Sequence, residues 1–406
     1  MRLHKLKRSA VECHVTSAKP LEMRSTGTGS PEAASRTPTD PGWQMRGVWP
    51  PVPRLVAIGD LHGDLGKAKA ALRTAGVLDA DTDSWCGGTT VAVQVGDILD
   101  RGDNEVGIFQ LLHRLQREAA LSGGRLHVMN GNHESMNVLA AHTPGGRFKY
   151  ATPGGLADFA AWRRNEEVRA AFKLMLFGSK SDRRSETQKH VEAACRAAAP
   201  AAAASVARAE ALCMTCAFTR QFLHGKPVAL QVGSTLFTHG GWVPEHAARG
   251  IDAINADADA WMRGTSCASS TQQPPALPPV LGGSRAVVWA RGHGWPDPSK
   301  CDCEDLTKAL RATPSAPARV VVGHTIQKGG INAACGGAAI RVDVGMSAGC
   351  GDGGVQVLEI LDDGRAGMYV LKDTPEGVIR TRVPTAEAMF ANMQAAKQTA
   401  AKGGRP

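Results

Sequence analysis

The feature that most constrains the fold of this chain is a succession of strand–loop–helix units. Short apolar runs predict strands at residues 55–58, 89–95 and 126–129. The spacing of apolar residues predicts helices at 65–75 and 104–121 between them. Units that alternate in this way are typical of βαβ crossovers and a parallel sheet. The sequence therefore predicts an α/β protein in which these strands end at one shared rim.

Each of these strands is followed at once by a cluster of polar side chains between glycines. The clusters occupy residues 59–64, 96–102 and 131–134. In open α/β sheets, binding sites lie at the carboxyl ends of the strands, so we expect the clusters to lie side by side. The candidate site residues that they supply are Asp60, His62, Asp97, Asp100, Arg101, Asn132 and His133.

The same arrangement recurs in the second half of the chain. Apolar runs at 228–232, 234–237, 286–290 and 319–322 predict further strands, and a strand at 339–344 and a closing hairpin at 355–371 complete the pattern. Any one polar residue after such a strand has an ordinary structural explanation, such as a turn. Chance does not explain the whole set in the same position. The candidates in this half are His239, Arg291 and His324.

Several of these side chains form a donor set for metal ions. They offer oxygen and nitrogen atoms and no thiolate, which suits Mn, Fe or Zn better than Ca or Mg. Two ions roughly 3.5–4 Å apart would use such a set if one carboxylate bridged them, and Asp97 is the expected bridge. We expect two divalent ions, manganese first and iron or zinc as alternatives. The expected ligands are Asp60, His62, Asp97, Asn132, His239 and His324.

The remaining candidates suit chemistry at phosphorus. Two metal ions stabilise both the attacking and the leaving oxygen of an in-line displacement. Arg101 and Arg291 would hold the phosphate oxygens with their planar guanidinium groups. His133 is the candidate acid for the departing alkoxide, with Asp100 to hold its imidazole. The predicted reaction is hydrolysis of a phosphate ester.

The chain outside these motifs divides into further parts. Residues 1–52 are rich in Ser, Thr, Pro and Gly without periodicity and predict a disordered basic tail. The predicted catalytic domain spans 53–385. It contains an alanine-rich segment at about 150–225 that predicts an inserted helical region or lid, with a low-complexity surface expansion as the alternative for its alanine run. Residues 386–406 predict a polar, helix-prone tail.

Most of the net charge of +9 lies in the two tails. Residues 1–52 hold eight Lys and Arg against four acids, and residues 386–406 hold three against one. We therefore expect no nucleic-acid partner, which would need a basic stripe on the folded part. No apolar run approaches the roughly 20 residues that span a bilayer, and no secretory signal begins the chain. The expected location is cytoplasmic or mitochondrial, with the chloroplast as an alternative.

Ten cysteines include two close pairs, Cys213 with Cys216 and Cys301 with Cys303. Two such pairs could together bind zinc. Redox pairing, with Cys301 and Cys303 as the candidate residues, is a second interpretation. Ordinary reduced thiols are favoured, because disulfides are not the default in a chain without a secretory signal.

The polar clusters resemble the motifs of a known family. Residues 59–63, 96–102 and 131–134 resemble the three signature blocks of phosphoprotein phosphatases, in the calcineurin-like metallophosphoesterase superfamily. Residues 238–241 and 323–325 resemble the two later histidine motifs of that family. The resemblance runs in order through most of the chain.

Two departures narrow this resemblance. Eukaryotic Ser/Thr phosphatases carry Leu-Trp-Ser-Asp-Pro where residues 288–291 read Val-Trp-Ala-Arg, and their Ser-Ala-Pro-Asn-Tyr loop is replaced at 343–350. Both departures resemble the Shewanella-like protein phosphatases. Residues 301–303 and 323–327 resemble the second, non-plastid type of plants and algae.

The resemblance implies a four-layer αββα fold, a β-sandwich flanked by helices, and a metal-dependent phosphatase that acts on phosphorylated proteins. It implies one ion on Asp60, His62 and Asp97, a second on Asp97, Asn132, His239 and His324, phosphate contacts from Arg101, Asn132 and Arg291, and His133 with Asp100 as the acid.

Two other functions stay open at this point. The same metal core would serve a hydrolase of small compounds such as dinucleoside polyphosphates, and residues 150–225 and 265–285 would frame its mouth. A redox-controlled interaction protein with little activity is the third hypothesis, although the complete donor set argues against it. Residues 142–150 are longer than the family's short aromatic segment, so preference for phosphoserine, phosphothreonine or phosphotyrosine is not carried over.

Overall fold

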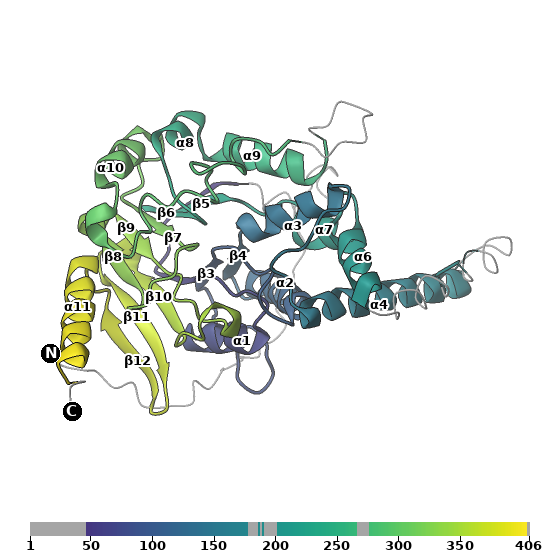
Figure 1. The fold of residues 1–406 in the computed structure, drawn as a ribbon, viewed down its shortest axis with the longest axis horizontal. Coiled ribbons are helices and arrows are strands. Elements are labelled where there is room, and N and C mark those ends of the chain that lie inside the picture. The colour runs from purple at the N-terminus through teal and green to yellow at the C-terminus, as the bar shows by residue number, and fades with distance from the viewer. Residues whose placement is uncertain (1–45, 178–185, 187–188, 191–200, 266–275, 404–406) are drawn as a thin grey trace, which may run out of the picture.

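The computed structural model describes residues 46–177, 186, 189–190, 201–265 and 276–403. Two six-stranded sheets form the centre of the molecule, and helices cover their outer faces (Figure 1). One continuous hydrophobic core includes side chains from both sheets and from the helices on either side. The four-layer α/β architecture expected from the sequence is confirmed.

The first sheet contains the three N-terminal strands that the sequence predicts. Its strands are β2 (Arg54–Ile58), β3 (Val91–Gln94), β4 (Arg125–Val128), β10 (Gln356–Leu361), β11 (Gly367–Thr374) and β12 (Gly377–Arg382). Their order is β12-β11-β10-β2-β3-β4. Because β2, β3 and β4 are parallel neighbours, their carboxyl ends open onto one rim.

The second sheet supplies the later histidines. Its strands are β1 (Val48–Trp49), β5 (Ala229–Val232), β6 (Thr235–Thr238), β7 (Arg319–Val322), β8 (Asn332–Ala334) and β9 (Ala339–Arg341). Their order is β1-β5-β6-β7-β9-β8, and β6, β7 and β9 run parallel. His239 follows β6 and His324 follows β7 at the same end of the sheet.

Helices complete the outer layers (Figure 1). The helices of the body are α1 (Leu65–Thr74), α2 (Glu105–Leu121), α3 (Asn132–His142), α8 (Pro244–Arg249), α9 (Ile251–Met262), α10 (Cys303–Ala312) and α11 (Ala386–Gly403). Short 3₁₀ turns lie at Pro298–Lys300, Cys335–Gly337, Ala348–Cys350 and Asp362–Gly364. Asp64 caps α1 by accepting a hydrogen bond from the amide of Lys67 at 3.0 Å. None of the described helices combines the length and apolar content needed to cross a membrane.

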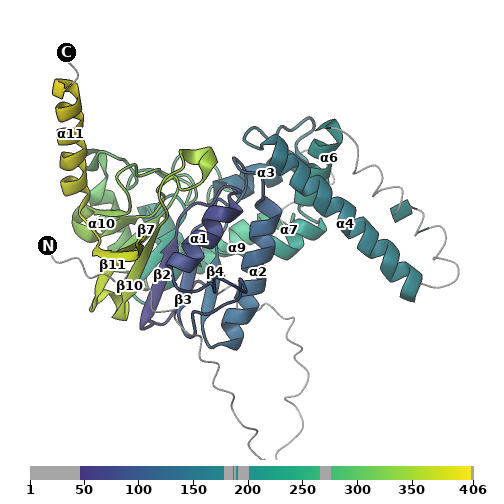
Figure 2. The same cartoon turned by 90° about the horizontal axis from the view of Figure 1, so that it is seen from below.

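The insert that lies between β4 and β5 in the sequence is helical, as predicted. It contains α4 (Pro153–Phe177), α6 (Ala201–Leu212) and α7 (Ala217–Phe222). The far end of α4 projects from the body (Figure 2). The fully buried ring of Phe218 fixes the insert to the core, because its centroid lies 5.3 Å from that of Phe109 and 4.9 Å from that of Phe159. Part of the alanine run, residues 197–200, lies outside the described residues.

Two local predictions were wrong. Residues 286–290 do not form a strand, because the chain turns there and the amide of Ala290 donates to the carbonyl of Ala286 at 2.8 Å. The predicted tail at 1–52 extends too far, because Val48 and Trp49 pair with β5. The ring of Trp49 lies under the guanidinium of Arg125, 4.0 Å from its centroid, which explains the order there. Residues 1–45 lie outside the described part of the chain.

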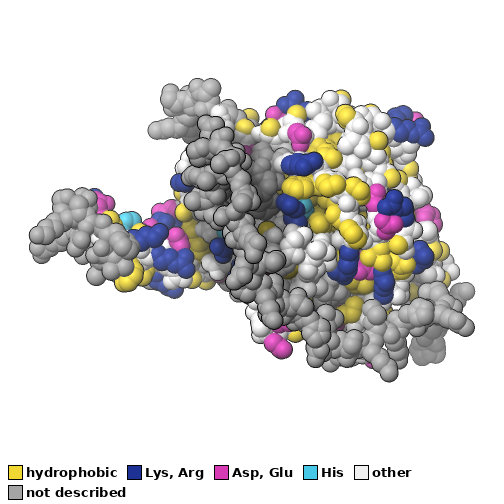
Figure 3. All heavy atoms as spheres, turned by 180° about the vertical axis from the view of Figure 1, so that it is seen from behind, with side chains coloured by type: hydrophobic (Ala, Val, Ile, Leu, Met, Phe, Trp, Pro, Cys, Tyr) yellow, Lys and Arg dark blue, Asp and Glu magenta, His cyan; other side chains and the backbone are white. Residues whose placement is uncertain are grey.

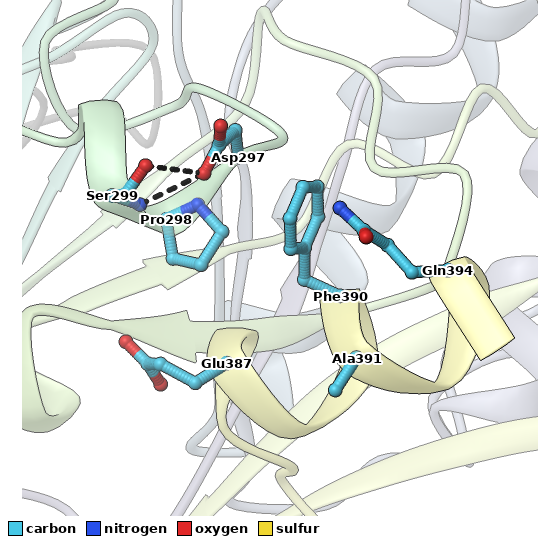
Figure 4. A pocket seen from close by; sticks show the side chains of 7 residues that line it. All are labelled: Asp297, Pro298, Ser299, Glu387, Phe390, Ala391 and Gln394. Carbon is cyan, nitrogen blue, oxygen red and sulfur yellow. Dashed lines mark hydrogen bonds between the residues drawn. The ribbon is translucent and has the colours of Figure 1, made fainter.

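The surface of the molecule shows two further features. On the face in Figure 3, Lys and Arg side chains lie in several separate groups with apolar and acidic side chains between them. A hollow of about 530 Å³ lies between α11 and the turn at Asp297, where the ring of Phe390 stands beside Pro298 (Figure 4). The Asp297 carboxylate there accepts hydrogen bonds from the amide and hydroxyl of Ser299. These bonds within the turn already use the carboxylate.

The cysteines pair differently from the expectation. Cys303 forms a disulfide with Cys335, and Cys301 is a free thiol, so the predicted pair of Cys301 and Cys303 is wrong. Cys213 and Cys216 form a second disulfide. Neither the zinc interpretation nor the fully reduced one fits this arrangement. Cys335 could not be recognised as the partner from local spacing, because it lies 32 residues after Cys303.

We expect Cys303→Ser to lower the free energy of unfolding by about 2–4 kcal/mol under non-reducing conditions, because the bond closes a long loop. Urea unfolding with and without reductant measures this loss, which reductant should abolish. Cys301→Ser is the matched control and should change stability by less than about 1 kcal/mol. Equal losses in the two variants would contradict the pairing with Cys335.

Candidate active site

The candidate site lies where the loops after β2, β3, β4, β6 and β7 meet. The loops after β2 and β3 are joined directly, since the amides of Leu61 and His62 both donate to the carbonyl of Asp97 at 3.0 Å. Residues other than glycine rarely adopt positive φ, and such strain of about 1–3 kcal/mol each gathers at functional sites. The candidates with positive φ are His62 (41°), Asp97 (56°), Asp100 (70°), Arg101 (66°) and His324 (64°).

Glu134 fastens the second loop to the third. Its buried carboxylate accepts hydrogen bonds from the amides of Asp97 (3.0 Å), Ile98 (2.9 Å), Leu99 (3.1 Å) and Gly131 (2.7 Å). A Cβ atom on Gly131 would lie 2.2 Å from Oδ1 of Asp97, so the approach of the two loops requires glycine. The sequence analysis gave Glu134 no role. Its position in the first turn of α3 is the signal that could have indicated one.

Asp97 lies at the centre of a buried cluster of imidazoles. Its Oδ2 lies 3.1 Å from Nε2 of His239, 3.7 Å from Nε2 of His62 and 3.8 Å from Nε2 of His133. The ligand atoms of Asp97, His239 and His324 all lie within 4.8 Å of one another, and so do those of His62, Asp97 and His133. Asp97 thus belongs to both groups of possible metal ligands, and its expected role as a bridging carboxylate stays a prediction.

The histidines present Nε2 to this cluster. Nδ1 of His62 lies 2.9 Å from the carbonyl of Leu99, and Nδ1 of His239 lies 3.0 Å from the carbonyl of Val95. A carbonyl only accepts, so Nδ1 carries a hydrogen in both rings and Nε2 is the atom available to a metal ion. Nε2 of His324 is buried with no hydrogen-bond partner among the described residues. An unpartnered buried nitrogen is costly, and a metal ion would satisfy it.

The protonation states favour metal binding. Burial lowers the pKa of His62 to about 4 and that of His324 to about 2, so both imidazoles are neutral near pH 7. Burial alone would raise the pKa of Asp97, but His239, His133 and His62 hold it well below its ordinary value. Burial opposes the charged form of His239, yet Asp97 outweighs it and raises the pKa of His239. A divalent ion would replace that proton.

A group of buried carboxylates adds negative charge. Asp60 accepts a hydrogen bond from the amide of His324, 3.1 Å from Oδ2. Burial, and then the charges of Asp343 and Asp97, raise the pKa of Asp60 well above its ordinary value. Burial raises the pKa of Asp343 to about 6. The sequence analysis missed Asp343 as a site residue, although it follows β9 at the same rim. Carboxylates crowded in this way favour a bound cation.

The structure brings all six expected ligands to this cluster. Asn132 begins α3, and its Oδ1 lies 2.9 Å from Nε2 of His239. Carboxylate, amide and neutral imidazole donors without a thiolate match the chemistry of Mn, Fe or Zn. The residues present therefore fit a divalent metal centre.

The expected acid lies beside the metal cluster. Nδ1 of His133 lies 2.6 Å from Oδ2 of Asp100, and both side chains are buried. Burial opposes the charged imidazole, but Asp97 and the hydrogen bond to Asp100 outweigh it and raise the pKa of His133. Nη2 of Arg101 lies 3.3 Å from Nε2 of His133, and Nη1 of Arg101 donates to Sγ of Cys350 at 3.3 Å.

Arg291 reaches the same rim from a turn. Its guanidinium donates to Oγ1 of Thr325 at 2.9 Å and to the carbonyl of His324 at 3.1 Å. Burial lowers the pKa of Arg291, while Asp343 and Asp60 act against that change. The exposed side chain of Arg291 thus lies close enough to the carboxylates to feel their charge.

Residues 143–150, in the segment that is longer than in the family, form one wall of the site. The ring centroid of Tyr150 lies 5.3 Å from that of His133, and its carbonyl accepts a hydrogen bond from the amide of Arg101 at 2.8 Å. A pocket of about 450 Å³ opens between this segment and α3, next to Asp100. It is lined by Asp100, Met136, Asn137, Leu139, Ala140, Thr143, Gly146, Arg147, Phe148, Lys149 and Tyr150.

Known proteins resemble this chain over most of its length. The chain is 38% identical over 323 residues to Shewanella-like protein phosphatase 2 of Arabidopsis thaliana. The matched region covers 79% of this chain and 78% of that protein. The chain belongs to the Shewanella-like protein phosphatases. Residues 53–190 match the family model of the calcineurin-like phosphoesterases. A shorter match, 36% identical over 106 residues, covers 26% of this chain and 27% of Shewanella-like protein phosphatase 1 of Plasmodium berghei.

Solved structures place the fold of this Shewanella-like protein phosphatase among known ones. A cold-active protein tyrosine phosphatase solved at 1.1 Å superposes with a TM-score of 0.57 at 18% identity, over 88% of each chain. The cold-active enzyme of a psychrophilic Shewanella species superposes with a TM-score of 0.53 at 18% identity, over 87% of this chain and 89% of that one. At this identity the likeness concerns the fold. The family relationship makes this chain a metal-dependent protein phosphatase that acts on phosphoproteins.

Proposed function

We propose that this phosphatase hydrolyses phosphate monoesters on proteins at the cluster centred on Asp97, with two manganese ions as its cofactors. One ion would lie between Asp60, His62 and Asp97, and the other between Asp97, Asn132, His239 and His324. Such ions would activate a water molecule and neutralise charge on the phosphate when bound. The observation that carries the proposal is the buried Nε2 of His324, which faces Asp97 and His239 without a hydrogen-bond partner among the described residues.

The chain's own cations would hold the phosphate. Arg101 lies next to His133, and Arg291 lies next to His324. Arg101 is partly buried and Arg291 is exposed, so each guanidinium has donors free for phosphate oxygens. The amide nitrogen of Asn132 would add a further donor. These contacts orient the phosphorus for attack from the side opposite the leaving oxygen.

His133 would protonate the leaving oxygen. Its Nδ1 is engaged by Asp100, so its Nε2 is the atom that faces the substrate. The raised pKa of His133 keeps the proton available near neutral pH. The ring of Tyr150 lies beside this imidazole, with 5.3 Å between the two ring centroids.

The test is hydrolysis of matched phosphoserine, phosphothreonine and phosphotyrosine peptides by purified protein, with and without added manganese. We expect metal-dependent release of phosphate. Two solved structures of similar fold are tyrosine phosphatases by name, and we propose phosphotyrosine as the preferred residue, with the pocket beside Asp100 taking neighbouring side chains. Turnover of dinucleoside polyphosphates without turnover of any peptide would overturn the proposal.

We also propose a cytoplasmic or mitochondrial location, with the chloroplast as an alternative. The support is the basic composition of residues 1–52, which hold eight Lys and Arg against four acids. Imaging of the full chain with a fluorescent fusion at its C-terminus tests this location, and secretion of the fusion would contradict it.

A further inference from the structure

Arg208 is a buried cation that the proposed reaction does not use. It lies on α6, in the helical insert, and its side chain is fully buried. A charge in such a place needs partners of opposite charge. Its partners are the residues that surround the proposed acid rather than residues of the insert.

All three guanidinium nitrogens of Arg208 are engaged. Nη2 donates to Oδ1 of Asp100 at 3.0 Å and to Oε1 of Glu105 at 2.9 Å. Nη1 donates to Oε2 of Glu105, and Nε donates to Oδ1 of Asn137 at 3.1 Å. The rings of Phe148 and Phe159 flank the guanidinium, with centroids 5.4 Å and 4.7 Å from its carbon. The planar fork therefore has one orientation available.

These contacts fix the carboxylate of Asp100. Its Oδ1 accepts from Arg208, and its Oδ2 accepts from Nδ2 of Asn137 at 2.8 Å and faces Nδ1 of His133 at 2.6 Å. Asn137 joins the same network from the other side, because its Oδ1 accepts from Arg208. The carboxylate cannot turn without breaking a hydrogen bond to a buried group. Its Oδ2 is thereby held toward the imidazole.

The formal charges of this group balance only when Arg208 is present. Asp100 and Glu105 are two buried acids in contact, since the amide of Asp100 donates to Oε1 of Glu105. Arg208 offsets one of them, which leaves the other to face His133. Without Arg208, two neighbouring carboxylates would compete for one imidazole and for any water that entered.

Stability alone is a weak explanation for this arrangement. Replacing a buried ion pair with apolar residues of similar volume is often neutral or stabilising. The guanidinium of Arg208 instead holds Asp100 in place beside His133. Residues that hydrogen-bond to a reacting group's partner in this way orient the groups that perform the chemistry.

We propose that Arg208 is a positioning residue for leaving-group protonation: the helical insert supplies the cation that holds Asp100 against His133. The inference rests on the proposed function, in which His133 delivers the proton. It makes the insert a part of the active site's support and ties proton delivery to the docking of α6. It predicts that the importance of Arg208 depends on how much the leaving group needs a proton.

The experiment compares two substrates. The leaving group of p-nitrophenyl phosphate is acidic and departs without much help, whereas that of a phosphotyrosine peptide, with a pKa of about 10, needs the acid. For Arg208→Met at saturating manganese, we expect kcat to fall about 10–100-fold on the peptide and less than about 3-fold on p-nitrophenyl phosphate. Arg208→Lys, which keeps the charge but loses the fork, should give an intermediate ratio.

Arg54→Met is the matched control. Arg54 is a partly buried arginine at the start of β2, away from the rim, and it pairs with Glu359 at 2.8 Å. Its replacement should change both rates by the same factor. If circular dichroism shows that Arg208→Met is unfolded, Arg208→Lys provides the test. The quantity compared is then the ratio of its losses in kcat on the two substrates.

Equal losses on the two substrates, or no loss, in the Arg208 variants would overturn the inference and leave Arg208 as a structural residue. A wild-type protein inactive on both substrates would instead contradict the proposed function, so the two failures are distinguishable.

Discussion

Asp97→Asn is expected to abolish turnover of every phosphate monoester. The substitution keeps the shape of the side chain but removes the charge at the centre of the His62, His239 and His133 cluster. Metal ions are worth several kcal/mol of transition-state stabilisation, so loss of the shared ligand should lower kcat by about 10³-fold or more. Metal content by elemental analysis should also fall, which provides a measurement independent of activity.

Asp363→Asn is the matched control for this variant. Asp363 has the same kind of backbone conformation, with φ of 54° against 56° for Asp97, and its carboxylate accepts hydrogen bonds from the amide and hydroxyl of Ser234. An asparagine oxygen can accept the same bonds, so activity and metal content should stay near wild type. If Asp97→Asn retained wild-type turnover at saturating manganese, the shared-ligand role would be wrong.

His133→Asn should slow peptide dephosphorylation by about 10²–10⁴-fold, the usual contribution of a positioned acid. The metal cluster keeps its six expected ligands in this variant, so metal content should change little. Because the acid matters less for an acidic leaving group, p-nitrophenyl phosphate should lose far less activity than a phosphotyrosine peptide. Steady-state kcat and KM for both substrates measure the difference.

His142→Asn serves as the control, since His142 lies at the other end of α3 and contacts the carbonyl of Val138 at 3.0 Å. It should leave the ratio between the two substrates unchanged. A uniform loss on both substrates in His133→Asn would show that His133 acts on the phosphate or the metals rather than as the acid.

The rim of the site was predictable because its geometry follows from local patterns. Three apolar runs, each ending in a polar cluster, require parallel neighbours whose ends meet, and that is where Asp60, Asp97 and Asn132 lie. His239 and His324 follow the same rule in the second sheet. The apolar run at 286–290 does not follow this rule, because apolar content alone does not distinguish a buried turn from a buried strand.

The support behind the rim could not be predicted in the same way. Arg208 is a single cation in an alanine-rich helix, a pattern that usually indicates a solvent-facing side chain, and its partner Asp100 is 108 residues away. Cys335 and Asp343 likewise acquire their roles only when two distant segments pack together. Nothing in the local spacing of either residue identifies its neighbour.

The hydrogen bond between Asp60 and the amide of His324 joins residues that are 264 positions apart. A ribosome adds roughly 5–20 residues per second, so His324 is made roughly 13–53 s after Asp60. Throughout that time the nascent chain lacks His324, and its first sheet stays incomplete until β10, β11 and β12 have also been made. In our proposal the full set of ligands therefore exists only once His324 has been made, so a metal ion can be held by all of them only late in synthesis or afterwards.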